Sequence, residues 1–76
     1  MPKLPVVKAR ELVRVLSKLG FSLSHFVGSH AQFKNKHGQR VTVPIHGGNE
    51  ITPKTLKSIL RDTELQVEEF INLLKR

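Results

Sequence analysis

The spacing of hydrophobic residues near the start of the chain predicts an amphipathic helix over residues 8–19. Its apolar positions recur three or four residues apart, as on one helix face, and they are Ala9, Leu12, Val13, Leu16 and Leu19. Gly20 supplies the stop. Arg10, Arg14 and Lys18 are four residues apart, so they stack on a second face of this helix. Solvation and contact with phosphate groups explain this basic ridge equally well.

Alternation of hydrophobic and polar residues predicts three antiparallel strands in the next segment. They cover residues 21–27, 30–35 and 40–43. Gly28 with Ser29 supplies the first chain reversal, and a Lys-His-Gly segment supplies the second. The alternation weakens near the end of the first strand, where one side carries Phe21, Leu23, His25 and Val27 and the other carries Ser22, Ser24 and Phe26.

Proline and glycine divide the rest of the chain into a loop and two helices. Pro44 ends the third strand because proline cannot extend a ladder, and residues 45–50 are expected to form a mobile, glycine-rich loop. Thr52 is a good N-cap, and Pro53 a good first residue, for a helix that runs to about Arg61. A last, shorter helix has helical hydrophobic spacing, which predicts a packing role; the residues are Val67, Phe70, Ile71 and Leu74.

These elements predict an α+β fold in the order α-β-β-β-α with an extra short C-terminal helix. Helices can cover only one face of a three-stranded sheet, so the other face is expected to stay open to solvent. The side chains expected together on that open face are His30, Gln32, Lys34, Arg40 and Thr42. A chain of 76 residues has room for one domain, which we expect to span residues 1–76.

Composition favours a reducing compartment without membrane contact. The chain has no cysteine, which excludes disulfides and thiolate metal sites. Residues 1–7 contain two prolines and too few apolar residues for a signal-peptide core or a membrane span. We therefore expect a cytoplasmic protein.

The net charge of +7 is concentrated in the first part of the chain. Residues 1–61 carry eleven Lys and Arg against Glu11 and Glu50, a net of +9, whereas residues 62–76 carry two cations against four acids, a net of −2. A body this basic attracts a phosphate backbone or an anionic membrane. The apolar stripes are used by one core, so we expect nucleic acid as the partner rather than a membrane.

Metal-dependent hydrolysis is disfavoured by the distribution of possible ligands. Four of the six acids follow residue 61, and the other two lie in separate predicted elements. The histidines lack the one-face spacing of a zinc pair and have no cysteine beside them; they are His25, His30, His37 and His46. No phosphate-binding loop motif is present. We expect no metal and no other cofactor.

RNA cleavage without a metal fits these residues, because RNA supplies its own nucleophile. An enzyme then only has to move a proton from the 2′-hydroxyl, protonate the leaving 5′-oxygen and stabilise charge on the phosphate. Histidine is the side chain that exchanges a proton near neutral pH, and His30 directly follows the Gly28 and Ser29 turn. We assign His30, as the single catalytic histidine, the role of general base or acid. His46 and His25 are second candidates for the complementary step, but we favour a loop or packing role for each.

Cations near this turn are candidates for gripping phosphate oxygens. We predict that role for Lys34 and Arg40, with Lys57 or Arg61 as further contacts. The backbone N–H groups of Gly28 and Ser29 are candidate donors to the developing oxyanion. The alternative, from a different class of function, is a non-catalytic RNA-binding module.

The order of motifs resembles the HicA family of toxin components from toxin-antitoxin systems. The resemblance rests on a first helix followed by Gly20-Phe21, Gly28-Ser29-His30, Phe33, Val43-Pro44 with His46, Thr55-Leu56 and Ile59-Leu60. It extends over roughly residues 6–74. One position differs, since members of the family often carry arginine where this chain has His25.

This resemblance implies a fold similar to double-stranded RNA-binding domains and an mRNA-cleaving ribonuclease that inhibits translation. Its essential histidine corresponds to His30. The resemblance also implies a HicB-type antitoxin that covers the active face, and an acidic partner would suit a basic surface. We expect a monomer when free and a hetero-oligomer with the antitoxin.

Overall fold

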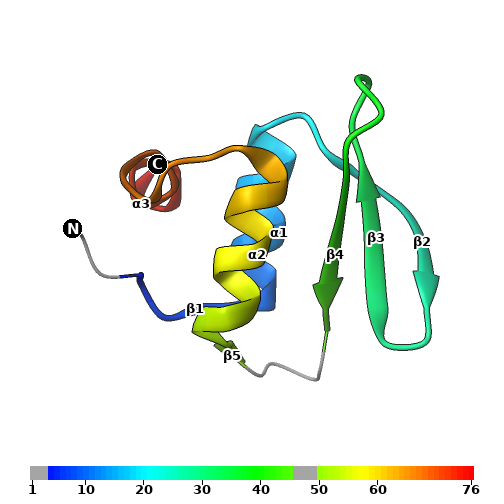
Figure 1. The fold of residues 1–76 in the computed structure, drawn as a ribbon, viewed down its shortest axis with the longest axis horizontal. Coiled ribbons are helices and arrows are strands. Elements are labelled where there is room, and N and C mark those ends of the chain that lie inside the picture. Colours follow the sequence, from blue (N-terminus) through cyan, green and yellow to red (C-terminus); the bar gives the residue numbers. More distant parts are fainter. Residues whose placement is uncertain (1–3, 46–49) are drawn as a thin grey trace.

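The protein has two layers, a three-stranded sheet and the helices that cover one of its faces (Figure 1). The structure is a computed structural model and describes residues 4–45 and 50–76. Its elements in chain order are β1 (Val7–Lys8), α1 (Ala9–Lys18), β2 (Ser22–Val27), β3 (His30–Lys34), β4 (Arg40–Pro44), β5 (Glu50–Ile51), α2 (Pro53–Thr63) and α3 (Val67–Lys75). The predicted α+β order with an extra C-terminal helix is confirmed.

The sheet is the predicted antiparallel meander, with strand order β2-β3-β4. Phe33 lies opposite Val41, Ala31 lies opposite Val43, and all four side chains are buried. Residues directly opposite one another share a face of the sheet, so these four residues define the inner face, toward the helices. The intervening residues of β3 and β4 therefore lie on the outer face, as the alternation predicted.

A bulge in β2 changes which of its residues face inward. Leu23 lies opposite Phe33 and His25 lies opposite Gln32, so Ser24 is an extra residue on this strand. The expectation that Leu23 and His25 share a side is therefore wrong. The extra residue places His25 on the outer face, and the next residue of the strand returns to the inner face.

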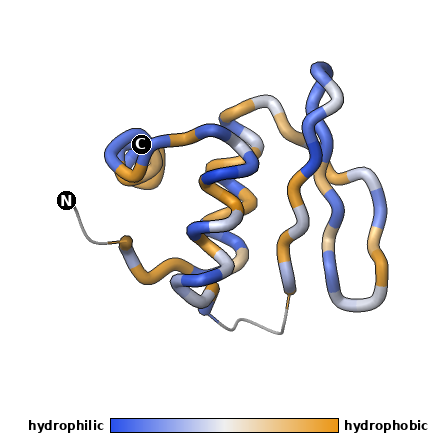
Figure 2. The backbone as a smooth tube through the Cα atoms, in the orientation of Figure 1, coloured by the Kyte–Doolittle hydropathy of each residue, from blue (hydrophilic) through white to orange (hydrophobic). Residues whose placement is uncertain are grey.

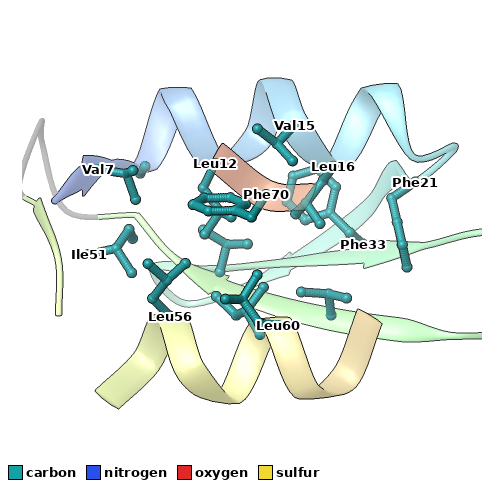
Figure 3. Packing of buried hydrophobic residues seen from close by; sticks show 14 of the residues in the cluster. Val7, Leu12, Val15, Leu16, Phe21, Phe33, Ile51, Leu56, Leu60 and Phe70 are labelled. Carbon is teal, nitrogen blue, oxygen red and sulfur yellow. The ribbon is translucent and has the colours of Figure 1, made fainter. Parts of the chain in front are cut away.

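The core lies between the inner face of the sheet and the helices, and α3 completes it. Figure 3 shows the Phe70 ring between α1 and α2, close to Leu12 and Leu16, and all three side chains are buried. Along α1 and α2, hydrophobic positions alternate with hydrophilic ones (Figure 2), as expected of helices with one buried side. The predicted packing role of the last helix is confirmed.

Local hydrogen bonds cap the N-termini of both main helices, close to the starts that the sequence predicted. The backbone N–H of Lys8 donates to Glu11 Oε1 at 2.9 Å, at the start of α1. Thr52 Oγ1 accepts from the Thr55 N–H at 3.3 Å, and Pro53 is the first residue of α2. This helix runs two residues past Arg61, to Thr63.

None of the helices in the described parts of the chain has the length and hydrophobicity needed to cross a membrane.

A second, two-stranded sheet joins the N-terminal segment to the start of α2. Val7 pairs with Ile51 and Lys8 with Glu50, and the two apolar partners are buried. The sequence predicted no strand here and assigned Glu50 to a loop. The rest of that predicted loop, residues 46–49, lies outside the described residues, and so does His46.

Candidate functional site

His30 is held at the end of the central strand by both of its neighbours. Gly28 has a φ of +61°, and the first central position of a two-residue hairpin turn requires a positive φ of this kind. The turn places Val27 opposite His30, which also lies opposite Pro44 in β4. The Ile45 N–H donates to the Ser29 carbonyl at 2.9 Å, so the ladder continues beside the turn. The backbone of His30 is thus fixed from two sides, and its imidazole is exposed.

The outer face of the sheet carries polar side chains along β3 and β4, although the two residues directly opposite His30, Val27 and Pro44, are apolar. The sequence predicted five residues there, and alternation with the buried residues places all five on this face: His30, Gln32, Lys34, Arg40 and Thr42. Thr42 Oγ1 donates to Gln32 Oε1 at 2.9 Å, which links the middle of β3 to β4. None of the helices in the described segments covers this face (Figure 1), so a polymer can lie along it.

A second histidine joins this face through the β2 bulge. His25 lies opposite Gln32, and Val27, two residues later, lies opposite His30. His25 and His30 are therefore diagonal neighbours, whose separation in a sheet is roughly 7–8 Å. His25 Nδ1 is 3.1 Å from Ser24 Oγ. The extra residue of the bulge therefore also hydrogen-bonds the imidazole that it shifts to the outer face. The bulge therefore brings a second histidine to the outer face, near His30.

Lys34 and Arg40 form a separate basic pair at the other end of the same face. They lie directly opposite one another in the β3–β4 register. Lys34 is four positions along β3 from His30, a distance of about 13 Å. At that distance the pair is suited to phosphates further along the strand rather than to the one beside His30.

Lys57 and Arg61 lie in the helical layer, apart from the other candidates. Both are exposed on α2, which packs over β4 on the inner side of the sheet. With Lys54 and Ser58 they line a surface hollow of about 320 Å³. The structure therefore does not bring them to the His30 face, and they form a separate group of cations on α2. Ser58 is a residue of the hollow that the sequence analysis missed, because a lone serine on a polar helix face carries no signal.

Two residues of the basic ridge on α1 bind the end of α3. Arg14 Nη2 donates to the Leu74 carbonyl at 3.0 Å. Lys18 Nζ donates to the carbonyls of Leu73 at 2.8 Å and Arg76 at 2.7 Å. Cations at the C-terminus of a helix satisfy its last carbonyls and interact favourably with its dipole. The ridge therefore has a structural role that neither sequence interpretation included.

Every polar or charged side chain in the described segments is at least partly exposed to solvent. No polar or charged side chain is buried in residues 4–45 and 50–76. The same segments contain no group of three or more histidine or acidic side chains placed to hold a metal ion.

Comparison with known proteins identifies the family. A family model described as HicA toxin of bacterial toxin-antitoxin matches residues 9–65, from the first residue of α1 to just beyond α2. No curated protein matches the chain. The resemblance seen in the sequence is confirmed, and the matched segment contains both histidines of the outer face. The chain belongs to the HicA family of bacterial toxins from toxin-antitoxin systems.

Proposed function

We propose that this toxin is a metal-independent endoribonuclease that cleaves mRNA and so inhibits translation. The observation that carries the proposal is the exposed His30, fixed beside the Gly28 turn on the open face of the sheet, with His25 as its diagonal neighbour. Two imidazoles at this spacing can serve the two proton transfers of RNA cleavage.

The chemistry is transfer of the phosphoryl group to the ribose itself. One imidazole removes the proton of the 2′-hydroxyl while the 2′-oxygen forms a bond to phosphorus. The bond from phosphorus to the 5′-oxygen breaks, and the other imidazole protonates that oxygen. The products are a 2′,3′-cyclic phosphate and a 5′-hydroxyl. Either assignment of the two histidines balances protons, and both imidazoles return to their starting forms in the later hydrolysis of the cyclic phosphate.

The remaining candidates bind the substrate. The N–H groups of Gly28 and Ser29 are proposed to donate to the developing charge on the phosphate, because they lie in the turn beside His30. Lys34 and Arg40 would bind phosphates further along the RNA, about two strand repeats from the phosphate beside His30. Lys57 and Arg61 would bind another part of the RNA. The cognate partner is proposed to be a HicB-type antitoxin, which forms a hetero-oligomer with a toxin that is monomeric when free.

End-group analysis tests this function. Purified toxin is incubated with a defined mRNA, and the cleavage sites and product termini are mapped. We expect 5′-hydroxyl and cyclic phosphate ends, the same rate in EDTA, and no cleavage of an RNA with a 2′-deoxynucleotide at the mapped position. Cleavage of the deoxy substrate or 5′-phosphate products would contradict the mechanism, since both require a nucleophile other than the 2′-hydroxyl.

A non-catalytic RNA-binding module is the second candidate, and the α2 hollow favours it. Lys54, Lys57 and Arg61 offer three cations to phosphates without any proton-transfer group among the residues that line the hollow. RNA binding by purified toxin without any cleavage of mRNA would support this candidate over the ribonuclease.

A further inference from the structure

β2 is an edge strand whose hydrophobic residues are not covered. It is the outer strand of the sheet, and all six of its residues are exposed. Within residues 4–45 and 50–76, four large hydrophobic side chains remain exposed, and three of them belong to β2: Leu23 at 50%, Phe26 at 54% and Val27 at 57%. An apolar strip on one strand is the kind of surface that another protein covers.

Two of these side chains continue the core beyond the helices. Leu23 and Phe26 lie opposite the buried residues Phe33 and Ala31, so they belong to the inner face. The helices pack over β4, at the opposite edge, and β2 lies farthest from them (Figure 1). The inner face is therefore incomplete at β2, which the helices of the described segments do not reach.

The backbone of β2 is also open to pairing. An edge strand presents one row of N–H and C=O groups that its own sheet does not use. Proteins commonly protect such edges with lysine, proline or a bulge, and of these β2 has only the bulge, in its first half. The bulge at Ser24 interrupts the regular ladder, so the segment best suited to a new strand is residues 25–27.

Charge indicates what kind of strand fits this edge. Residues 1–61 carry a net charge of +9, and Lys34 with Arg40 lies on the outer face of the same sheet. Self-association through β2 would bring two chains of net charge +7 together. An acidic partner gains attraction from the same charges. Its side chains would have to alternate, with an acidic residue beside His25 on the outer face and apolar residues beside Leu23 and Phe26 on the inner face.

We propose that the β2 edge is where the antitoxin docks, by adding an extended strand whose apolar side chains cover Leu23 and Phe26. Acidic side chains of that strand lie on the outer face, beside His25. Only the consequence of docking rests on the proposed function: the added strand covers the histidine pair and stops cleavage. The mode of recognition is strand addition, in which main-chain hydrogen bonds supply affinity and alternate side chains supply specificity.

Substitution of the strip tests the docking surface. Leu23→Lys and Phe26→Lys, singly and together, place cations on the inner face of the edge, and Val6→Lys is the matched control because Val6 is 71% exposed away from this strand. Binding of the purified cognate antitoxin is measured by calorimetry. We expect the double variant to bind at least 100-fold more weakly and the Val6 variant to bind within twofold of the parent. Equal binding by the double variant would overturn the proposal.

Hydrogen exchange of the unmodified complex gives a readout that does not depend on the folding of any variant. We expect amides of residues 25–27 to exchange at least tenfold more slowly with antitoxin bound. Protection confined to α2 or α3 would overturn the proposal. A dimer of the free toxin that Phe26→Lys dissociates would also overturn it, because the edge would then be closed by a second copy.

The ribonuclease proposal can fail independently. If the parent toxin does not cleave RNA but antitoxin binding depends on Phe26, the docking surface stands and the proposed function falls. If the parent cleaves RNA and the double variant cleaves equally well but resists the antitoxin, both proposals stand.

Discussion

His25 lies directly opposite Gln32 in the β2–β3 register, one residue after the bulge at Ser24. This pairing places its imidazole on the same side of the sheet as His30. His25→Ala should lower single-turnover cleavage by about 10²- to 10⁴-fold, the usual contribution of a general acid or base. His25→Arg keeps a cation for phosphate but cannot exchange a proton near neutral pH, so it should bind RNA normally and cleave slowly. Full cleavage by both variants would remove His25 from the mechanism.

The α2 hollow should contribute to RNA affinity and not to the chemical step. Lys57→Ala and Arg61→Ala each remove one cation, so each substitution should make the salt dependence of RNA binding shallower by about one unit of slope. The cleavage rate at saturating toxin should stay the same. A lower rate at saturation would mean that α2 contacts the reacting phosphate, contrary to its position in the helical layer.

Gly28 supplies a backbone conformation that other residues adopt with strain. A Cβ at this position would meet no atom of the described residues within 4 Å, so the cost of Gly28→Ala comes from its φ of +61°. We expect a loss of about 1–2 kcal/mol in the free energy of unfolding, measured by urea titration. Gly28→Asn should lose less, because asparagine tolerates left-handed backbone. Equal losses for the two variants would indicate that strain is not the cause.

Lys18 should stabilise α3 rather than bind RNA. Lys18→Ala removes two hydrogen bonds to the last carbonyls of α3, and we expect it to lower the free energy of unfolding by about 0.5–1 kcal/mol at this exposed position. Arg10→Ala, at an exposed residue two turns earlier on α1, is the control. If Lys18→Ala weakens RNA binding and leaves stability unchanged, the phosphate-contact interpretation of the ridge is the correct one.

Phe70 tests whether α3 belongs to the folded unit. The family match ends at residue 65, yet this ring is fully buried against α1. Phe70→Ala should cost about 3–5 kcal/mol, and Phe70→Leu considerably less. The total free energy of unfolding of a small domain is only about 5–15 kcal/mol, so thermal unfolding of the alanine variant should begin near ambient temperature. A small loss for the alanine variant would show that the core does not depend on α3.

Local signals predicted most of this fold because they depend on neighbours in the sequence. The Gly28 turn and the Thr52 cap with Pro53 are examples, as each depends on residues within three positions. The bulge at Ser24 was not predicted, because period-two alternation assumes that no residue is extra. Phe26, an apolar residue out of phase with Leu23, was the available signal for it.

Contacts between distant segments escaped the sequence analysis for a different reason. The hydrogen bonds from Lys18 to α3 join residues 55 and 58 positions apart, and the pairing of Val7 with Ile51 depends on how the chain folds back. Periodicity reports which face of an element is buried, not which element lies against it. Alternation therefore predicted which residues share the outer face of the sheet, whereas the separation of Lys57 and Arg61 from His30 depends on how the layers are arranged.

Cleavage and binding by His30→Ala give the most direct test of the ribonuclease. The control is His37→Ala, an exposed histidine in the turn at the other end of β3. We predict that the His30 variant binds RNA within twofold of the parent and cleaves it at least 10²-fold more slowly in single turnover, while the His37 variant does both normally. Unchanged cleavage by His30→Ala, with its fold verified by circular dichroism, would contradict the account.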